Sequence, residues 1–296
     1  MSAELQKYFN HRVLPDENLN ECWDRIIVPP VDKRILMNYA KGMASLNGVS
    51  PVVGAFYRSV LFLGDKGTGK STLARGYANQ VAKQVWSGRQ VNLFELRTHS
   101  LFSEWEGRSS KELAQAFELV RFSARHNPTI LIADEVESLA YDRRGMIQSN
   151  DPTDLIRAVD TLLNEMDQLR FIERVLFVAT SNFPEVVDEA VWDRFDIKIR
   201  FKYPEKNGRA KILIDCFEEF SKAGLSLDEE DALLVAQATE GLSPRAVKRG
   251  VLSAQWVTGK PFERLSVDDI IRAARDLVLG EKAVSRDERR ISDEHD

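Results

Sequence analysis

Residues 64–71, with the sequence GDKGTGKS, have the types and spacing needed to bind a phosphate group. They match GxxxxGK[ST] and lie between a short apolar run and a segment with helical spacing. The glycines let backbone N–H groups turn toward a β-phosphate, and the positive end of the following helix adds attraction. We expect Lys70 to reach the β- and γ-phosphates and the Ser71 hydroxyl to bind Mg²⁺. The predicted nucleotide-binding residues of this loop are Gly64, Asp65, Lys66, Gly67, Thr68, Gly69, Lys70, Ser71 and Thr72.

Two carboxylates follow a second apolar run, 129–133. Asp134 can hold Mg²⁺ from this position, while Glu135 can orient and deprotonate an attacking water. Asn182 follows the apolar run 175–179 and could hydrogen-bond that water or the γ-phosphate, although alone it would be an ordinary turn residue. Together with the glycine loop, these residues predict a phosphoryl-transfer centre that uses ATP and Mg²⁺ at one edge of a sheet.

The elements that must position these residues alternate between strands and helices. Strands are expected at 59–64, 92–97, 129–133 and 175–179, which predicts an α/β fold with a parallel sheet covered on both faces. After residue 203 only helical segments follow, at 206–222, 228–239, 244–257 and 266–278. We therefore expect a short N-terminal extension (1–22), a large α/β domain (23–203), a small helical lid (204–279) and a disordered charged tail (280–296).

Composition narrows the classes of partner and location. The formal net charge is −5, whereas proteins that mainly grip nucleic acid carry an excess of Lys and Arg. Cys22 and Cys216 lack the neighbours that a zinc site or disulfide framework would need. No apolar run is long enough for a signal peptide or a membrane span. We expect a cytoplasmic protein with no membrane association and reduced thiols.

Several motifs together resemble those of the AAA+ ATPases. They are the glycine loop at 64–71, DEVESL at 134–139, TSN at 180–182, DRFD at 193–196 and GLSPR at 241–245. Three sequences of the chain are similar to those of one branch, the pachytene-checkpoint ATPases: DEVESL, LFSEW at 101–105 and VWDRFDIK at 191–198. This resemblance implies a phosphate-binding-loop sheet sandwiched by helices with a helical lid, a homo-hexameric ring, and ATP-driven remodelling of HORMA-domain proteins.

One departure from that branch concerns the N-terminus. The eukaryotic members carry a sizeable N-terminal domain that helps to grip the substrate, and this chain has about 22 residues there. In this respect it is similar to compact bacterial relatives found beside cyclic-oligonucleotide anti-phage signalling systems. That resemblance implies antiviral defence, in which the ATPase disassembles a HORMA–nucleotidyltransferase complex and restrains the alarm. How the role of the missing domain is filled stays open.

The resemblance also assigns roles to two arginines. Arg194 in DRFD matches the arginine that AAA+ rings insert into the neighbouring subunit's ATP site; the alternative is a surface ion pair with Asp193 or Asp196. Ser243 is a good N-cap and Pro244 a good first helical residue, which places Arg245 in a first turn where the helix dipole disfavours a cation. A bound phosphate would offset that conflict, so we expect Arg245 to sense the nucleotide from the lid.

Other assignments by resemblance have equally simple alternatives. Trp105 matches the pore-loop residue that grips the substrate, and a buried tryptophan is the alternative. A second pore loop is expected at 143–145. Arg157 would face the subunit boundary or form a structural ion pair. Ile26 and Ile27 match the position where relatives wrap the adenine, but ordinary core packing explains them as well.

Three functions compete at this stage. The favoured one is a hexameric ATP-driven motor that pulls on a HORMA-domain protein. A nucleic-acid ATPase, such as a helicase loader, would need a basic groove and strongly salt-dependent binding, which the acidic net charge disfavours. A scaffold that assembles on ATP without turnover would have no use for Glu135, because that side chain serves hydrolysis rather than binding.

Overall fold

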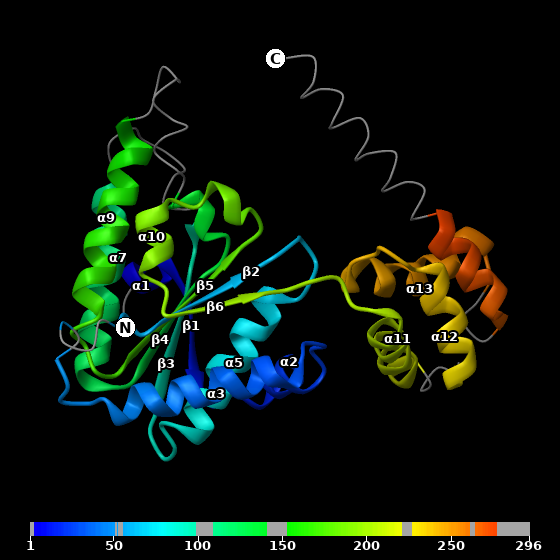
Figure 1. Cartoon of the computed structure of the whole chain (residues 1–296), viewed down its shortest axis with the longest axis horizontal. Coiled ribbons are helices and arrows are strands. Elements are labelled where there is room, and N and C mark those ends of the chain that lie inside the picture. The colour runs from blue at the N-terminus through cyan, green and yellow to red at the C-terminus, as the bar shows by residue number, and fades with distance from the viewer. Residues whose placement is uncertain are drawn as a thin grey trace. The chain divides into compact units, whose positions relative to one another are not determined.

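A six-stranded sheet forms the centre of the larger of the two units of this protein (Figure 1). The computed structural model describes residues 3–50, 52, 56–98, 109–140, 153–220, 227–260 and 264–276. The strands are β1 (Phe9–Leu14), β2 (Ser59–Leu63), β3 (Val91–Leu96), β4 (Thr129–Ala133), β5 (Val175–Ser181) and β6 (Ile197–Arg200). Their order is β1-β3-β4-β5-β2-β6, and every pair is parallel except β1 with β3. The fold is therefore α/β with a mainly parallel sheet, as the sequence predicts.

Helices cover both faces of this sheet. Figure 1 shows α7 (Ser109–His126) and α9 (Thr153–Leu169) on one face, and α3 (Pro30–Ser45) and α5 (Lys70–Gln84) on the other. Shorter elements complete the unit: α1 (Ala3–Tyr8), η1 (Glu17–Leu19), α2 (Asn20–Asp24), η2 (Val136–Ser138), η3 (Pro184–Val186) and α10 (Glu189–Asp193). Among the described residues, no helix is both long and apolar enough to cross a membrane.

The two faces have separate apolar cores, and the central strands contribute to both. Along β4, Leu131 and Ala133 pack into the cluster on the α7 and α9 side, while Ile130 and Ile132 pack into the cluster on the α3 and α5 side. All residues of β2, β4 and β5 are buried. Burial on both faces explains why these strands are continuous apolar runs rather than alternating ones.

Two edge strands differ from the expectation. Residues 1–22 are not merely an extension, because β1 pairs antiparallel with β3 and buries Phe9 and Leu14 in the two cores. At the other edge, β6 pairs with β2 over four residues, where Ile199 is buried and Lys198 and Arg200 are exposed. Both strands carry polar or charged side chains among their exposed positions, such as Asn10 and Arg12 in β1, so neither has the continuous apolar signal of a central strand.

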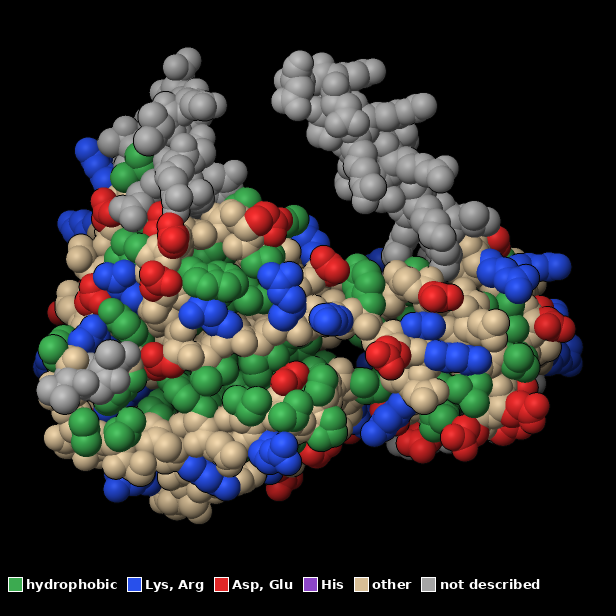
Figure 2. All heavy atoms as spheres, viewed as in Figure 1, with side chains coloured by type: hydrophobic (Ala, Val, Ile, Leu, Met, Phe, Trp, Pro, Cys, Tyr) green, Lys and Arg blue, Asp and Glu red, His purple; other side chains and the backbone are tan. Residues whose placement is uncertain are grey.

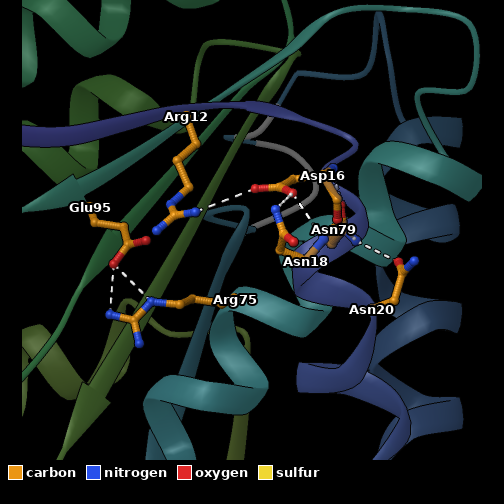
Figure 3. A network of polar contacts seen from close by, with 7 residues as sticks. All are labelled: Arg12, Asp16, Asn18, Asn20, Arg75, Asn79 and Glu95. Carbon is orange, nitrogen blue, oxygen red and sulfur yellow. Dashed lines mark hydrogen bonds and ion pairs between the residues drawn. The ribbon is translucent and has the colours of Figure 1, made fainter.

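A buried asparagine holds the N-terminal segment against α5 (Figure 3). The Asn79 side chain accepts a hydrogen bond from the backbone N–H of Asp16 at 2.9 Å and donates to the Asp16 carbonyl at 2.9 Å. It also donates to Asn20 Oδ1 at 3.0 Å, and the same oxygen accepts from Lys83. One amide therefore satisfies both backbone groups of Asp16 and fixes the chain between β1 and α2.

The helical unit follows the sheet and is described by itself. It contains α11 (Lys206–Phe220), α12 (Glu229–Ala238), α13 (Pro244–Thr258) and a further helix at 267–276, close to the predicted segments. Residues 65–69 belong to this helical unit by their contacts.

Within this helical unit, Lys260 Nζ lies 2.9 and 2.7 Å from the two carboxylate oxygens of Asp269, and this pairing lowers the pKa of Asp269 to about 2. The expected disordered tail, 280–296, lies outside the described residues.

We predict that Asn79→Ala lowers the free energy of unfolding by about 1–3 kcal/mol, because it removes a buried group and the partners of the Asp16 backbone. Urea unfolding followed by circular dichroism measures this loss. Gln84→Ala is the matched control, since Gln84 is exposed on the same helix and should change stability by less than about 0.5 kcal/mol. Equal stabilities for the two variants would contradict the anchoring role of Asn79.

Candidate functional site

The carboxyl ends of β4 and β5 bring the predicted acids together with the start of α5. In the parallel register Ala133 lies opposite Ala179, so Asp134, the first residue after β4, lies beside Thr180, which is still within β5. Ser71, on the first turn of α5, donates its hydroxyl hydrogen to Asp134 Oδ1 at 2.7 Å. The two predicted Mg²⁺ ligands are therefore in direct contact.

Glu135 and Asn182 form the second contact of the site. Asn182 Nδ2 donates to Glu135 Oε1 at 2.9 Å, so the predicted base touches the predicted water-orienting amide. The backbone of Glu135 is left-handed, with φ of 54°, which is uncommon for a residue other than glycine. The structure brings Asp134, Glu135 and Asn182 together as expected, and their catalytic roles stay predictions.

The glycine loop needs glycine at two positions for reasons visible in the backbone. Gly64 has φ of 137°, and a Cβ there would lie 2.4 Å from the Phe201 carbonyl oxygen. Gly67 has φ of 80°, and its Cβ would lie 2.9 Å from Ser243 Oγ. Lys70 is only 4% exposed, and its ammonium group donates to the Gly64 carbonyl at 2.5 Å. These contacts explain the glycines at 64 and 67, and the phosphate-binding role of the loop stays a prediction.

The remaining predicted loop residues line or flank this path. Thr68 Oγ1 donates to the Asp65 carbonyl at 2.8 Å, which closes the loop internally. Lys66 and Thr72 are exposed, and Gly69 has φ of 100°. The two Mg²⁺ candidates, Ser71 and Asp134, offer oxygen atoms, the hard donors that Mg²⁺ prefers alongside phosphate oxygens and water. The donor chemistry therefore fits the predicted metal.

A cavity of about 570 Å³ opens beside the acids and is lined by Asn10, Arg75, Glu95, Arg97, Asp134 and Glu135 among others. Figure 3 shows the Arg75 guanidinium pointing toward Glu95, with Nε and Nη2 at 2.9 and 2.7 Å from one carboxylate oxygen. These hydrogen bonds raise the pKa of Arg75. The ion pair holds the Arg75 guanidinium against Glu95, and both residues line the same cavity as Asp134 and Glu135.

Arg194 is held by the carboxylate of Asp167 on α9. Its Nε and Nη2 donate to the two oxygens of Asp167 at 3.0 and 2.8 Å, and Nη1 donates to the Ala190 carbonyl at 2.8 Å. This pairing raises the pKa of Arg194. The suggested ion pair with Asp193 or Asp196 is wrong: Asp193 is exposed, and Asp196 accepts from Tyr39 and from backbone N–H groups. The role of Arg194 in a neighbouring subunit stays a prediction.

The start of α13 matches the expectation for Arg245. Ser243 is the N-cap and accepts from the Ala246 backbone N–H at 3.2 Å, and Pro244 is the first helical residue. Arg245 is exposed in the first turn, and its backbone N–H donates to the Gly67 carbonyl at 3.3 Å. This capping arrangement is confirmed, and the sensor role of the side chain stays a prediction.

The structure describes some of the remaining predicted residues and not others. Ile26 is half-buried and packs against the α3 and α5 core, as the packing alternative proposes, and Ile27 is half-buried too. Arg157 is exposed on α9. Trp105 and the expected second pore loop at 143–145 lie outside the described residues.

Sequence reasoning missed two polar residues that contact the site. Thr180 shares its hydroxyl between Asp134 and the backbone N–H of Glu135. Glu137 accepts from the Asn182 backbone N–H at 3.0 Å through Oε1, while its buried Oε2 has no hydrogen-bond partner among the described residues. Alternation could have revealed Thr180, since side chains two residues apart on a strand share a face. Glu137 has no such signal, because it lies in the short 3₁₀ helix η2 rather than on a strand.

Comparison with known proteins identifies the family. The family model described as "ATPase family associated with various cellular activities (AAA)" matches residues 60–203. CD-NTase-associated protein 6 from Pseudomonas aeruginosa is 34% identical over 250 residues, which cover 81% of each chain. The pachytene checkpoint protein 2 homologue of Arabidopsis thaliana is 33% identical over 222 residues, or 73% of this chain and 48% of that protein. The chain thus spans about half the length of that plant relative.

A solved structure supports the fold. The structure of the E. coli MS115-1 HORMA:CdnC:Trip13 complex contains a similar chain, with a TM-score of 0.76 and 17% sequence identity. The match covers 93% of this chain and 97% of the other, so both the sheet and the helical unit have counterparts. With the glycine loop, the strand-end acids and a relative that is 34% identical over most of its length, the chain belongs to the AAA ATPase family.

Proposed function

We propose that this protein hydrolyses ATP with Mg²⁺ and uses the energy to remodel a HORMA-domain protein. One observation carries the first half of this proposal: Asn182 contacts Glu135 directly beside the contact between Ser71 and Asp134. A residue set for metal binding and a residue set for water activation thus lie next to each other. A site that only bound nucleotide would not need the second set.

Each residue of the proposed site has a defined role in ATP hydrolysis. The loop 64–71 binds the phosphates through backbone N–H groups, and Lys70 donates to the β- and γ-phosphates. Ser71 and Asp134 would hold Mg²⁺, which would supply positive charge to the phosphate oxygens. Glu135 accepts the proton of the attacking water, and Asn182 fixes the direction of the Glu135 carboxylate. Arg245 contacts the nucleotide from the lid.

Arg194 gives a reason for assembly into a ring. Its guanidinium is anchored in its own protomer by Asp167, and its carbonyl accepts from Ser59 at the start of β2. The hydrogen-bonded residues Ser71, Asp134, Glu135 and Asn182 instead gather at the carboxyl ends of the strands. We infer that Arg194 serves the site of a neighbouring subunit in a homo-hexamer, where a guanidinium stabilises the transferred phosphoryl group. Each site is then complete only in the assembly.

The relatives favour a HORMA-domain substrate. The first relative is named for association with a CD-NTase, and the matched chain of known structure comes from a complex with a HORMA protein and CdnC. We infer that this chain disassembles a HORMA–nucleotidyltransferase complex and thereby restrains anti-phage signalling in the cytoplasm. A nucleic-acid substrate is disfavoured by the net charge of −5 and by the interspersed acidic and basic side chains on the face shown in Figure 2.

We predict that Glu135→Gln reduces the ATP hydrolysis rate by about 10²–10⁴-fold, because the amide cannot accept the proton of the attacking water. Binding of a fluorescent ATP analogue should stay close to wild type, since the glycine loop is intact. Glu185→Gln removes the same charge from an exposed side chain of η3 and should leave the rate unchanged. Normal turnover in the Glu135→Gln variant would exclude Glu135 as the base.

We predict that Arg194→Ala reduces hydrolysis strongly, by about 10³–10⁵-fold if it acts like fingers in other nucleotide hydrolases. Mixing it with the Glu135→Gln variant should restore part of the activity. In mixed rings an intact Glu135 site can meet an intact Arg194 from its neighbour, which neither variant offers alone. Steady-state hydrolysis at varied mixing ratios measures this, and the absence of any rescue would argue against a shared site.

We predict that wild-type protein with ATP separates the HORMA-domain protein and nucleotidyltransferase of the same organism, whereas Glu135→Gln does not. Native mass spectrometry of the mixture measures the intact complex. Trp105→Ala should retain ATP hydrolysis but lose separation, because the resemblance makes Trp105 the gripping residue. A complex that stays intact with active wild-type enzyme would refute the proposed substrate while leaving ATP hydrolysis untouched.

A further inference from the structure

The buried hydroxyl of Thr180 contacts two residues of the proposed site. The residue is 1% exposed at the end of β5. Its Oγ1 donates to Asp134 Oδ1 and accepts a hydrogen bond from the Glu135 backbone N–H at 3.1 Å. One oxygen atom therefore contacts the side chain of the proposed metal ligand and the backbone of the proposed base.

Two other buried threonines, Thr239 and Thr129, satisfy their hydroxyls differently. Thr239 donates to carbonyl groups of its own helix, at Val235 and Ala236. Thr129, at the opposite end of β4, contacts Ser123 and the Asn127 carbonyl. These contacts stabilise local structure and involve no residue of the site. Thr180 differs because both of its partners belong to the proposed centre.

The backbone of Glu135 explains why such a contact is needed. With φ of 54°, Glu135 adopts a conformation that side chains with a Cβ disfavour, so surrounding contacts must hold it there. Its carbonyl accepts from the backbone N–H and the hydroxyl of Ser138, at 3.0 and 2.9 Å. Its N–H donates to Thr180. The left-handed turn is therefore held from both sides.

This turn decides where the Glu135 carboxylate lies. In the observed conformation Oε1 accepts from Asn182 Nδ2, and the Asn182 backbone N–H is itself held by Glu137. Thr180 and Asn182 both lie at the carboxyl end of β5. Thr180 contacts the backbone N–H of Glu135, and Asn182 contacts its side chain, so this one strand end positions both parts of Glu135. Asp134 Oδ1 accepts from both Ser71 and Thr180, which fixes the rotation of that carboxylate as well.

We propose that Thr180 is a positioning residue for ATP hydrolysis, whose hydroxyl sets the geometry of Asp134 and Glu135 together. This inference rests on the proposed function, because it concerns the same hydrolytic site. Thr180 does not touch the nucleotide in this account. It acts through the two acids, so its loss affects turnover more than nucleotide binding.

The test compares Thr180→Val, which removes the hydroxyl and keeps the branched shape, with Thr180→Ser, which keeps the hydroxyl. Thr180→Val should lower kcat by about 10–100-fold, the usual effect of losing a contact that orients a catalytic group. Its KM for ATP and its affinity for a fluorescent ATP analogue should stay close to wild type. Thr180→Ser should recover most of kcat, because the hydroxyl can contact both acids again.

Thr129→Val is the matched control, since it removes an equally buried hydroxyl from the far end of β4. It should change thermal stability without changing kcat. If Thr180→Val does not fold, Thr180→Ala and Thr180→Ser form the comparison, because only the serine variant keeps the hydroxyl. A higher kcat for serine than for alanine supports the proposal, and equal values overturn it.

The outcomes separate this inference from the proposed function. Wild-type protein that hydrolyses ATP, together with a Thr180→Val variant of equal kcat, overturns the positioning role alone. A Thr180→Val variant that loses nucleotide binding in proportion to kcat also overturns it, because that pattern indicates general damage. Wild-type protein without ATP hydrolysis overturns the proposed function, and the inference falls with it.

Discussion

The parallel pairing of β4 with β5 is the constraint on which the site depends. In this register Ala133 lies opposite Ala179, so Asp134 and Thr180 lie side by side at the carboxyl ends of the two strands. Both strands are buried on both faces, and a shift by one residue would move every side chain into the opposite core. The apolar packing of the strands therefore fixes the geometry of polar residues that take no part in that packing.

The same packing explains which parts of the fold could be predicted from the sequence. The central strands are continuous apolar runs because helices cover both of their faces, and such runs stand out in a single chain. Edge strands lack this signal. In β1 only Phe9 and Leu14 are buried, and β6 has exposed lysine and arginine on either side of Ile199. Their pairing partners, rather than their own composition, make them strands.

For the site, residue types were predictable and contact partners were not. The glycine loop and the strand-end acids follow from local spacing, so Ser71, Asp134 and Glu135 could be placed without coordinates. Arg194 pairs with Asp167, which precedes it by 27 positions on a different element. Sequence spacing suggests near neighbours such as Asp193 as ion-pair partners of Arg194. The actual partner depends on the direction of the side chains in the folded chain, which the sequence alone does not give. Thr180 was passed over for the same reason, because a threonine at a strand end has many possible partners.

The pairing of Arg194 with Asp167 within its own protomer is compatible with the proposed role of Arg194 in a neighbouring one. Each of its three nitrogens already donates one hydrogen bond, two to Asp167 and one to the Ala190 carbonyl. A guanidinium carries more N–H donors than these contacts use, so it can keep its anchor and donate to a phosphate as well. Its planar shape also fixes the direction of the remaining donors, whereas an ammonium group on a flexible stem would not. The bidentate pair with Asp167 is therefore compatible with a role in the neighbouring site, and it reduces the conformational freedom that Arg194 would lose on meeting a phosphate.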